Sequence, residues 1–447
     1  MGEVNKTEDI VFLFENYNCD SEKLHTSFKM AGMDYPAAVI DDDGFLPDGV
    51  ESVYGFFLGE FKSNETRKPR YFNEITVPDY WEIKSNNSVG KIYDYSKERG
   101  RIFYIKPTNK RLVKTVDWYD ERGIVRSSDH YNKYGVLYAR TIFNAKGQKV
   151  NKAYFSVTGT EVIVENYVTK DIIVNEGKTT RIFNSKTELV CYYLEKKGYT
   201  EKKLYYNTLS VPFFVSQSLH GHKMGDVLFW QEKPREDIPG NMTVILNQKN
   251  TRTEKIMVLN RKSYENFIKA GVNKDIVKSI GYIYDFKKGN NHRPEALICT
   301  NSDRILNCKK IINKIPEMNF SIVAVTEMSP KLMSLEKYDN VALFPSVKQK
   351  QLERLFSKCD FYLDINCESE IVSAVETAFM HNHLIFAFKE TVHNKEYVAD
   401  ENVYNESDYQ YLIDEIKKII QDRKLMERKI EIQHNAAGVA ERDHYTF

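Results

Sequence analysis

The chain has 447 residues, more than one hydrophobic core usually supports, so two or three domains are expected. Hydrophobic residues make up 42% of the chain and aromatic residues 13%, which is enough to build packed cores. The formal net charge of +1 argues against a nucleic-acid partner, because such partners are bound chiefly by neutralising phosphates.

The N-terminal segment predicts one βαβ unit. Residues 10–14 (IVFLF) form an apolar run that is typical of a buried strand. Residues 20–31 predict an amphipathic helix with polar residues at its start and Gly32 at its end, and Ala37 to Ile40 predicts the next strand.

A twelve-residue repeat follows, in which an aromatic residue precedes Asp, Asn or Ser, and Gly comes three positions later. The short polar side chain suits the first position of a type I turn, and Gly supplies the positive φ that closes a hairpin. The repeat therefore predicts an antiparallel meander of strands with seven or eight residues each, inserted in an α/β protein. The four copies are Tyr119-Asp120…Gly123, Tyr131-Asn132…Gly135, Phe143-Asn144…Gly147 and Phe155-Ser156…Gly159.

The meander is rich in lysine and arginine. From Lys91 to Tyr154 there are fifteen Lys or Arg residues and six Asp or Glu residues, a net charge of +9. A solvated basic sheet face explains this better than contact with an anionic surface. The sheet also has an exposed edge, through which it could dock a partner or a substrate.

The last 150 residues alternate strands and helices, which predicts a parallel sheet covered by helices on both faces. Such sheets bind ligands at the carboxyl ends of their strands, here the loops 325–330, 344–346 and 364–368. The predicted strands are 296–300, 320–325, 341–344, 361–363 and 384–388, the predicted helices include 305–315, 347–356, 370–379 and 408–422, and a charged tail includes 424–432. Between the meander and this half, βα elements are predicted around 227–231, 244–246 and 256–259.

Other chemistries lack support in the sequence. The six cysteines are scattered without metal-ligand spacing, which fits reduced thiols and a cytoplasmic location. His220-Gly221-His222 has no third ligand at a recognisable spacing, so we expect a loop and no metal site there. No apolar run is long enough for a membrane span, no Gly-x-Ser-x-Gly elbow is present, and we expect no cofactor.

Four motifs, in order around the predicted insertion, resemble one family. They are Asp43-Gly44-Phe45-Leu46-Pro47-Asp48-Gly49; Leu228-Phe229-Trp230-Gln231-Glu232 with Pro239-Gly240-Asn241-Met242; Thr326-Glu327-Met328-Ser329-Pro330-Lys331-Leu332; and Asp360-Phe361-Tyr362-Leu363-Asp364-Ile365-Asn366. Essentially the whole chain is similar to the GtfB family, the stabilising subunits of bacterial peptide O-N-acetylglucosaminyltransferases that modify serine-rich repeat adhesins.

The resemblance implies an α/β fold of the GT-B type, with two facing Rossmann-like domains and a large antiparallel β-sheet insertion in the first. On this basis we expect the first domain at residues 1–50 and 199–270, the insertion at 51–198, the second domain at 271–425 and a C-terminal tail at 426–447.

The resemblance also implies partners. It predicts a hetero-oligomer, a heterotetramer, with the catalytic homologue GtfA, which carries the UDP-sugar chemistry. A GtfB-type subunit would stabilise GtfA and help to hold the acceptor, a Ser/Thr-rich adhesin polypeptide. The family is tied to the accessory Sec export system and is described as peripheral at the cytoplasmic membrane.

Glu368 and Glu376 satisfy the spacing of the two carboxylates in retaining GT-B enzymes, so the chain could itself be a UDP-sugar transferase. Three features argue against that alternative. The segment from Glu368 to Glu376 has no glycine, residues 282–289 place Asp285 where a phosphate-binding cation is expected, and the first strand leads into the bulky segment 14–18 instead of a glycine-rich loop. We therefore interpret both glutamates as solvated or helix-capping carboxylates, and we predict no catalytic residue.

An extended Ser/Thr-rich polypeptide offers hydroxyls and backbone amides, so its site needs hydrogen-bonding groups and aromatic faces. We expect these in a cleft between the two domains. The candidates are Trp230, Gln231, Glu232, Asn241, Thr326, Glu327 and Ser329, with Phe229 assigned to the core and Trp230 open to either role.

Overall fold

The computed structural model describes residues 9–59, 68–219, 225–248 and 251–445. The chain divides into two compact units, Met1–Ser279 and Ile280–Phe447, and each is described by itself.

The first unit contains a seven-stranded parallel sheet in the order β17-β16-β15-β14-β1-β2-β3. The predicted βαβ unit is confirmed. β1 (Ile10–Phe14) leads into α1 (Cys19–Met30), where the Asn18 side chain accepts a hydrogen bond from the Ser21 backbone N–H, and β2 (Ala37–Val39) follows. The other strands are β3 (Val50–Ser52), β14 (Lys203–Tyr206), β15 (Asp226–Trp230), β16 (Thr253–Val258) and β17 (Val277–Ser279).

Helices α2 (Val53–Leu58), α3 (Lys186–Lys196), α4 (Val211–Ser218), α5 (Gly240–Leu246) and α6 (Arg261–Lys269) complete the parallel part of this unit. Residues 244–246 are the last turn of α5. The expectation of a strand-to-helix element starting there was wrong, because a short apolar run does not distinguish a strand from a buried helix.

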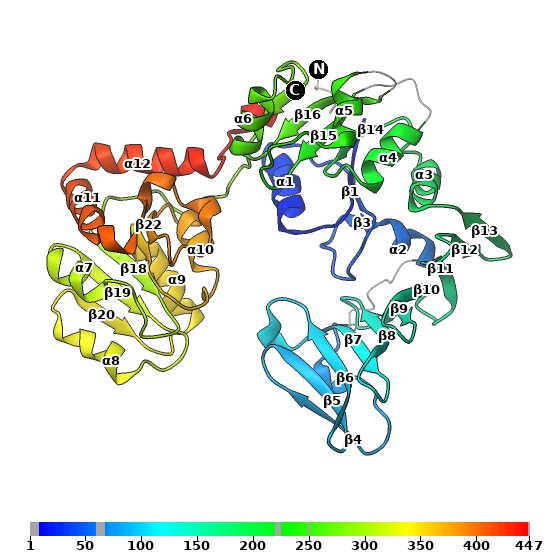
Figure 1. Ribbon diagram of the computed structural model, residues 1–447, viewed down its shortest axis with the longest axis horizontal. Helices are drawn as coiled ribbons and strands as arrows, with labels where there is room; N and C mark the ends of the chain where they lie inside the picture. Colours follow the sequence, from blue (N-terminus) through cyan, green and yellow to red (C-terminus); the bar gives the residue numbers. More distant parts are fainter. Residues whose placement is uncertain (1–8, 60–67, 220–224, 249–250, 446–447) are drawn as a thin grey trace, which may run out of the picture. The chain divides into compact units, whose positions relative to one another are not determined.

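The inserted sheet has ten antiparallel strands that follow one another in chain order from β4 to β13, as Figure 1 shows. Its strands are β4 (Trp81–Ser85), β5 (Val89–Asp94), β6 (Lys97–Tyr104), β7 (Val113–Tyr119), β8 (Val125–Tyr131), β9 (Leu137–Phe143), β10 (Lys149–Phe155), β11 (Glu161–Asn166), β12 (Ile172–Glu176) and β13 (Thr179–Phe183).

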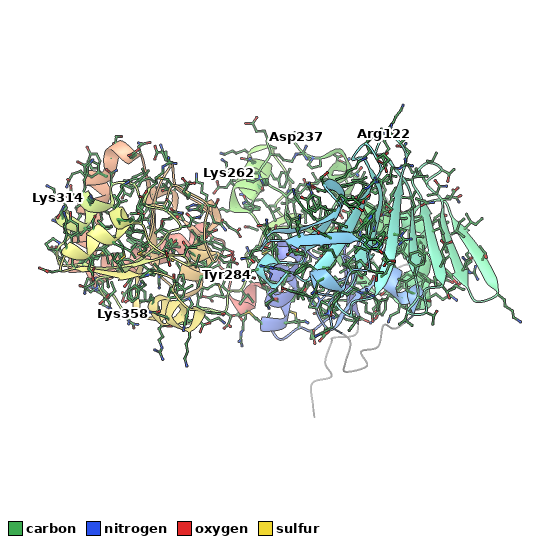
Figure 2. The ribbon with its side chains drawn as sticks, turned by 90° about the horizontal axis from the view of Figure 1, so that it is seen from below. Arg122, Asp237, Lys262, Tyr284, Lys314 and Lys358 are labelled. Atoms are coloured by element: carbon green, nitrogen blue, oxygen red, sulfur yellow. The ribbon has the colours of Figure 1, made fainter. Side chains whose placement is uncertain are left out.

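The repeat sets the spacing of this sheet. Strands β7 to β11 begin every twelve residues, and each of the four repeat glycines has a φ between 71° and 81°. In three of the turns, the Asp or Asn side chain that precedes the glycine accepts hydrogen bonds from two backbone N–H groups. The predicted hairpin turns are confirmed. In Figure 2 the strands lie side by side and Arg122 extends outward from the β7–β8 turn.

The second unit contains a six-stranded parallel sheet in the order β20-β19-β18-β21-β22-β23. Its strands are β18 (Glu295–Cys299), β19 (Asn319–Val323), β20 (Val341–Phe344), β21 (Phe361–Asp364), β22 (Leu384–Phe388) and β23 (Val403–Tyr404). Its helices are α7 (Cys308–Lys314), α8 (Pro330–Met333), α9 (Gln349–Lys358), α10 (Ala374–Met380), α11 (Tyr409–Gln421) and α12 (Arg423–Ala436).

Helix α10 begins four residues later than the sequence predicts. Val372 and Ser373 have φ angles of 52° and 47°, so the chain cannot be helical there. The Glu370 side chain instead accepts a hydrogen bond from the Val375 backbone N–H at 2.8 Å, at the first turn of the helix. This turn matters because it lies within the segment that separates Glu368 from Glu376.

Candidate functional site

The carboxyl edge of the first sheet gathers polar residues from several strands. Glu15 follows β1, Asp41 follows β2, Asn207 follows β14 and Gln231 follows β15. Because all these strands are parallel, their carboxyl ends meet at one edge of the sheet.

Predicted acceptor residues at this edge bind the protein itself. The Gln231 side chain donates to the Asp20 carbonyl at 2.7 Å and accepts from Asn207 at 3.1 Å. Asn241 donates to the Leu209 carbonyl at 2.9 Å, which joins α5 to the loop before α4. Gln231 and Asn241 therefore shape the edge, whereas Glu232 is exposed and lies 4.0 Å from Arg235.

Trp230 lies in the core of the first unit. It is 1% exposed and its ring lies 6.5 Å from that of Phe267. A ring at this depth offers no face to a polypeptide, so we assign Trp230, like Phe229, to the core.

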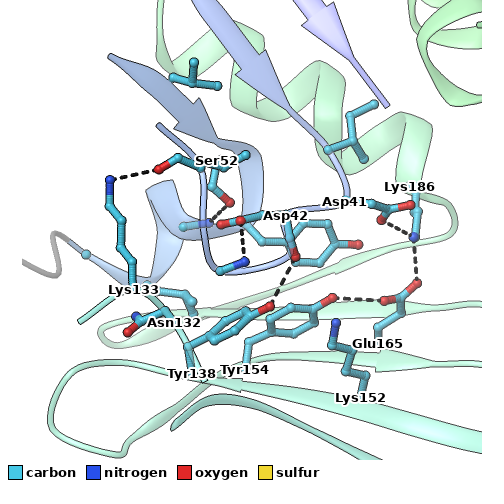
Figure 3. A pocket seen from close by; sticks show the side chains of 18 of the residues that line it. Asp41, Asp42, Ser52, Asn132, Lys133, Tyr138, Lys152, Tyr154, Glu165 and Lys186 are labelled. Atoms are coloured by element: carbon cyan, nitrogen blue, oxygen red, sulfur yellow. Dashed lines mark hydrogen bonds and ion pairs between the residues drawn. The ribbon is translucent and has the colours of Figure 1, made fainter. Parts of the chain in front are cut away.

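A pocket of about 850 Å³ lies at the β2–β3 end of the same edge (Figure 3). It is bounded by the loops after β2, by α2, by the inserted sheet and by the start of α3. Its polar and aromatic lining includes Asp41, Asp42, Ser52, Tyr54, Asn132, Lys133, Tyr134, Tyr138, Lys149, Lys152, Tyr154, Glu165, Tyr167 and Lys186. The pocket thus joins the Rossmann-like part of the unit to the insertion.

One cluster of charges ties these parts together. Lys186 at the start of α3 contacts Asp41 at 2.7 Å and Glu165 at 3.4 Å. The hydroxyls of Tyr154 and Tyr167 lie 3.4 and 3.3 Å from Glu165 Oε2. Glu165, which lies in β11, thus links the inserted sheet to α3 through Lys186.

Lys152, unlike Lys186, forms no ion pair among the described residues. In the part of the chain that the structure describes, no carboxylate lies within 4 Å of its ammonium group, which sits 4.7 Å from the Tyr154 ring centroid. Burial lowers the pKa of Lys152 to about 8, despite the opposing effects of Glu165 and Asp41, and Lys186 and Lys149 lower it further.

The carboxyl edge of the second sheet carries the remaining predicted acceptor residues. Thr326 and Glu327 are exposed in the loop after β19. The Ser329 hydroxyl donates to Asp303 at 3.1 Å and accepts from the Leu332 backbone N–H at 3.3 Å, so it caps α8. Thr326 and Glu327 are accessible, whereas Ser329 is already hydrogen-bonded.

Glu368 and Glu376 both have partners within this unit. Glu368 contacts Arg304 at 2.8 Å, and Glu376 accepts a hydrogen bond from the Tyr397 hydroxyl at 3.2 Å. The N-terminal turn of α10 is capped by Glu370. Glu368 is thus a surface ion-pair residue, and the helix-capping role proposed for it belongs to Glu370.

His393 forms a charged pair beside Glu368. Its Nδ1 lies 2.6 Å from Asp364 Oδ1, and its Nε2 lies 2.6 Å from the Glu368 carbonyl oxygen. The hydrogen bond to Asp364 raises the pKa of His393 to about 9, against the effect of burial. The pair fixes the loop after β21.

The segment 282–289, which carries Asp285, precedes the first strand of this unit. That strand is β18, and the loop after it carries Asp303 and Arg304. Lys288 instead contacts the buried Asp360, which also accepts from Arg293 at 2.9 and 3.0 Å. In the described residues, Arg304 is paired with Glu368, and Lys331 lies 3.6 Å from Asp303.

The described residues contain neither a metal-binding cluster nor a membrane-spanning helix. No group of three or more His, Cys, Asp or Glu residues among them is placed to hold a metal ion. No helix among them has the length and apolar character needed to cross a membrane. His220 and His222 lie outside the described residues.

The pocket was not predicted from the sequence. Its residues come from five separate segments, and several are tyrosines and lysines that are common on sheet surfaces. One signal was available: Asp41 and Asp42 directly follow a predicted strand, where parallel sheets place ligand-binding residues.

The chain matches four family models. They are described as the GtfB N-terminal domain (residues 11–57), the GtfB middle domain (81–184), the GtfB third domain (186–270) and the GftB/GlyA-F C-terminal domain (296–433). Together these ranges cover most of the chain.

Two relatives are called UDP-N-acetylglucosamine-peptide N-acetylglucosaminyltransferase stabilizing protein GtfB. The Streptococcus agalactiae protein is 40% identical over 92% of each chain, and the Streptococcus gordonii protein is 37% identical over 89% of each. Among solved structures, a chain in the GtfA/B complex bound to UDP and GlcNAc matches with a TM-score of 0.90 and 36% identity, over 97% of this chain and 98% of that one. Pneumococcal GtfA with UDP and GlcNAc shares the fold, with a TM-score of 0.52 and 13% identity over 96% of each chain.

Two parallel sheets of Rossmann type, with an antiparallel sheet inserted in the first unit, define a protein with the GT-B glycosyltransferase fold. The predicted fold class is confirmed. Within that class, the chain belongs to the GtfB family of peptide N-acetylglucosaminyltransferase stabilizing proteins.

Proposed function

We propose that this chain is the non-catalytic stabilising subunit of a heteromeric protein O-GlcNAc transferase. In this proposal its partner is a catalytic GtfA-type subunit, which transfers GlcNAc from UDP-GlcNAc to Ser or Thr of an adhesin polypeptide. The observation that carries the proposal is the match, over nearly the full length, to stabilizing proteins and to a chain of a GtfA/B complex.

The second unit supports a non-catalytic role. A retaining transferase needs a free carboxylate near the donor sugar and fixed cations on the leaving diphosphate. Here Glu368 and Arg304 neutralise each other, and Glu376 accepts from Tyr397. The loop between the two glutamates turns through Val372 and Ser373 instead of glycines, so side chains stand where backbone amides would approach phosphates.

We further propose that accessible residues at the carboxyl edges of both sheets help to hold the acceptor. Glu232, Thr326 and Glu327 are exposed and offer hydrogen-bonding groups to backbone amides and hydroxyls. Gln231 and Ser329 support this role indirectly, because their hydrogen bonds fix the loops that carry the exposed residues, and Asn241 fixes the loop before α4 at the same edge as Gln231.

The stabilising role can be tested with the partner. The GtfA-type subunit is expressed alone and together with this chain, and its soluble yield and thermal unfolding midpoint are measured. We expect both to rise in the mixture, since binding to the native state alone shifts the unfolding equilibrium. An unchanged midpoint at saturating concentrations of this chain would refute the stabilising role.

The acceptor role needs a separate measurement. An unmodified Ser/Thr-rich peptide is titrated into the full chain, and into a variant with Thr326→Ala and Glu327→Ala. We expect weaker binding by the variant, with Lys314→Ala, an exposed change at the end of α7, as the control. Equal affinities would rule out the loop after β19 as an acceptor contact.

We propose that the protein acts in the cytoplasm, peripherally at the membrane face where its partner works. All six cysteines are free thiols, which fits a reducing compartment.

A further inference from the structure

A β-bulge in β10 changes which side chains reach the pocket of the first unit. Lys149 pairs with Phe143 and Asn151 pairs with the adjacent Ile142, so β10 holds one extra residue here. In a regular strand, residues 149 and 152 would point to opposite faces of the sheet. The extra residue corrects the alternation, and both Lys149 and Lys152 line the pocket.

Neither lysine forms an ion pair in the described part of the chain, although Glu165 and Asp41 act on Lys152 from a longer distance. Among the described residues, no carboxylate lies within 4 Å of either ammonium group; Lys149 sits 5.6 Å from the Tyr167 ring centroid and Lys152 sits 4.7 Å from that of Tyr154. Lys149 is exposed and Lys152 is half-buried, and burial, then repulsion by Lys186 and Lys149, lowers the pKa of Lys152. An anion between them would offset this cost.

The carboxylates of the pocket do not supply that anion, because each is already engaged. Asp41 and Glu165 share Lys186. Asp42 accepts a hydrogen bond from the Gly44 backbone N–H at 2.7 Å and one from Ser52, and burial raises the pKa of Asp42, which weakens its charge.

The buried hydroxyl of Tyr54 is a further polar group of the pocket that has no hydrogen-bond partner among the described residues. Tyr54 lines the pocket and is 3% exposed. Its ring stacks on Tyr154 at 4.7 Å, so the hydroxyl is held by the packing of the ring and not by a polar contact. A buried hydroxyl without a partner costs free energy unless a ligand or water reaches it.

We propose that this pocket is an oxyanion site that takes a carboxylate or phosphate group, held by the ammonium groups of Lys149 and Lys152 and by the hydroxyl of Tyr54. Charge selects the ligand here, because the ammonium groups of Lys149 and Lys152 line the pocket without an ion pair among the described residues. The group can come from free phosphate or from an acidic side chain of the acceptor polypeptide. The second source rests on the proposed function.

Calorimetric titration of the full chain tests the site. The ligands are inorganic phosphate and a pair of Ser-rich peptides that differ only in one Glu or Gln. The variants are Lys152→Met, Lys149→Met and Tyr54→Phe, and the control is Lys146→Met, which removes a charge from the exposed β9–β10 turn. We expect each pocket lysine variant to weaken binding by about tenfold or more, Tyr54→Phe by about threefold, and the control to leave it unchanged.

The two sources give different outcomes. Binding of phosphate without preference for the Glu peptide supports the site and assigns it to a free anion, whereas tighter binding of the Glu peptide supports it and assigns it to the polypeptide. If neither ligand binds, or if binding survives all three pocket variants, the proposal is overturned. Tyr54→Phe keeps the test decisive if a lysine variant does not fold. The phosphate result is independent of the partner-stabilisation test.

Discussion

At the scale of single residues, the structure contains a buried charge that stabilises the fold, on Asp360, and one that destabilises it, on Lys152. Asp360 is fully buried and accepts hydrogen bonds from Arg293, from Lys288 and from the backbone N–H groups of Asn291 and Arg293. Burial would raise the pKa of Asp360, but these donors outweigh it and lower the pKa to about 2. The lowered pKa means that the folded state favours the charged form.

We predict that Asp360→Asn destabilises the second unit by about 3 kcal/mol, because it leaves two cations without their shared partner. Asp285→Asn is the matched control, since Asp285 pairs with Lys287 at an exposed site and is expected to cost less than about 1 kcal/mol. Urea unfolding of both variants measures the difference. Equal losses of unfolding free energy would show that Asp360 contributes no more to stability than the exposed Asp285.

In contrast to Asp360, the pKa of Lys152 is shifted in the direction that disfavours its charged form. Its pKa is about 8 in the folded state and 10.5 without the fold, so between these values the unfolded chain binds more protons. Stability must therefore rise with pH across this window. In phosphate-free buffer, we predict that the unfolding free energy of the unmodified chain rises relative to that of Lys152→Met as the pH increases from about 7.5 to about 10. If the difference in unfolding free energy does not change with pH, as expected for the exposed Lys146→Met, folding does not disfavour the charged form of Lys152.

At the scale of elements, the turns of the inserted sheet depend on glycine to different degrees. Gly135 and Gly147 both have positive φ, so alanine at either position strains the backbone by about 1 kcal/mol. A Cβ on Gly135 would also lie 2.6 Å from the Lys68 carbonyl oxygen, whereas the nearest atom to a Cβ on Gly147 is 3.8 Å away.

We therefore predict that Gly135→Ala lowers the thermal unfolding midpoint more than Gly147→Ala does. The comparison is internal, because both glycines occupy the same position of the repeat. Equal midpoints would mean that the contact between Lys68 and the turn does not constrain the sheet.

Local chemistry made the elements predictable. In each repeat an aromatic residue, a short polar residue (Asp, Asn or Ser) and Gly specify a turn within five residues, so the meander followed from the sequence. The start of α10 did not, because Val372 adopts a positive φ that its side chain disfavours, and only the surrounding structure imposes it. The role of Trp230 was open because a strand buried on both faces has no alternation to indicate which residues are exposed.

The candidate site was less predictable than the fold. The oxyanion pocket depends on a bulge at Lys149 and on contacts between residues 41, 165 and 186, which no local pattern connects. Lys288 and Asp360 are likewise separated by 72 positions. The division of the chain into five segments remains a prediction, as do the acceptor contacts at Glu232, Thr326 and Glu327.

At the scale of the whole molecule, the chain has the fold of a glycosyltransferase and belongs to a family of stabilizing proteins, and we propose that it acts without transferring a sugar. Two observations support this conclusion. The family match covers nearly all of the chain, and the carboxylates with transferase spacing are held by Arg304 and Tyr397. The alternative, an active UDP-sugar transferase, makes a different prediction for the same residues.

Transfer of GlcNAc from UDP-GlcNAc to a Ser-rich peptide measures the difference directly. The assay compares the isolated chain, the GtfA-type partner, and their mixture, each with the unmodified chain or with Glu368→Gln and Glu376→Gln together. We predict no turnover by the isolated chain, a higher rate in the mixture than with the partner alone, and little effect of the double substitution. Turnover by the isolated chain that the double substitution abolishes would instead identify the chain as a transferase and contradict a non-catalytic role.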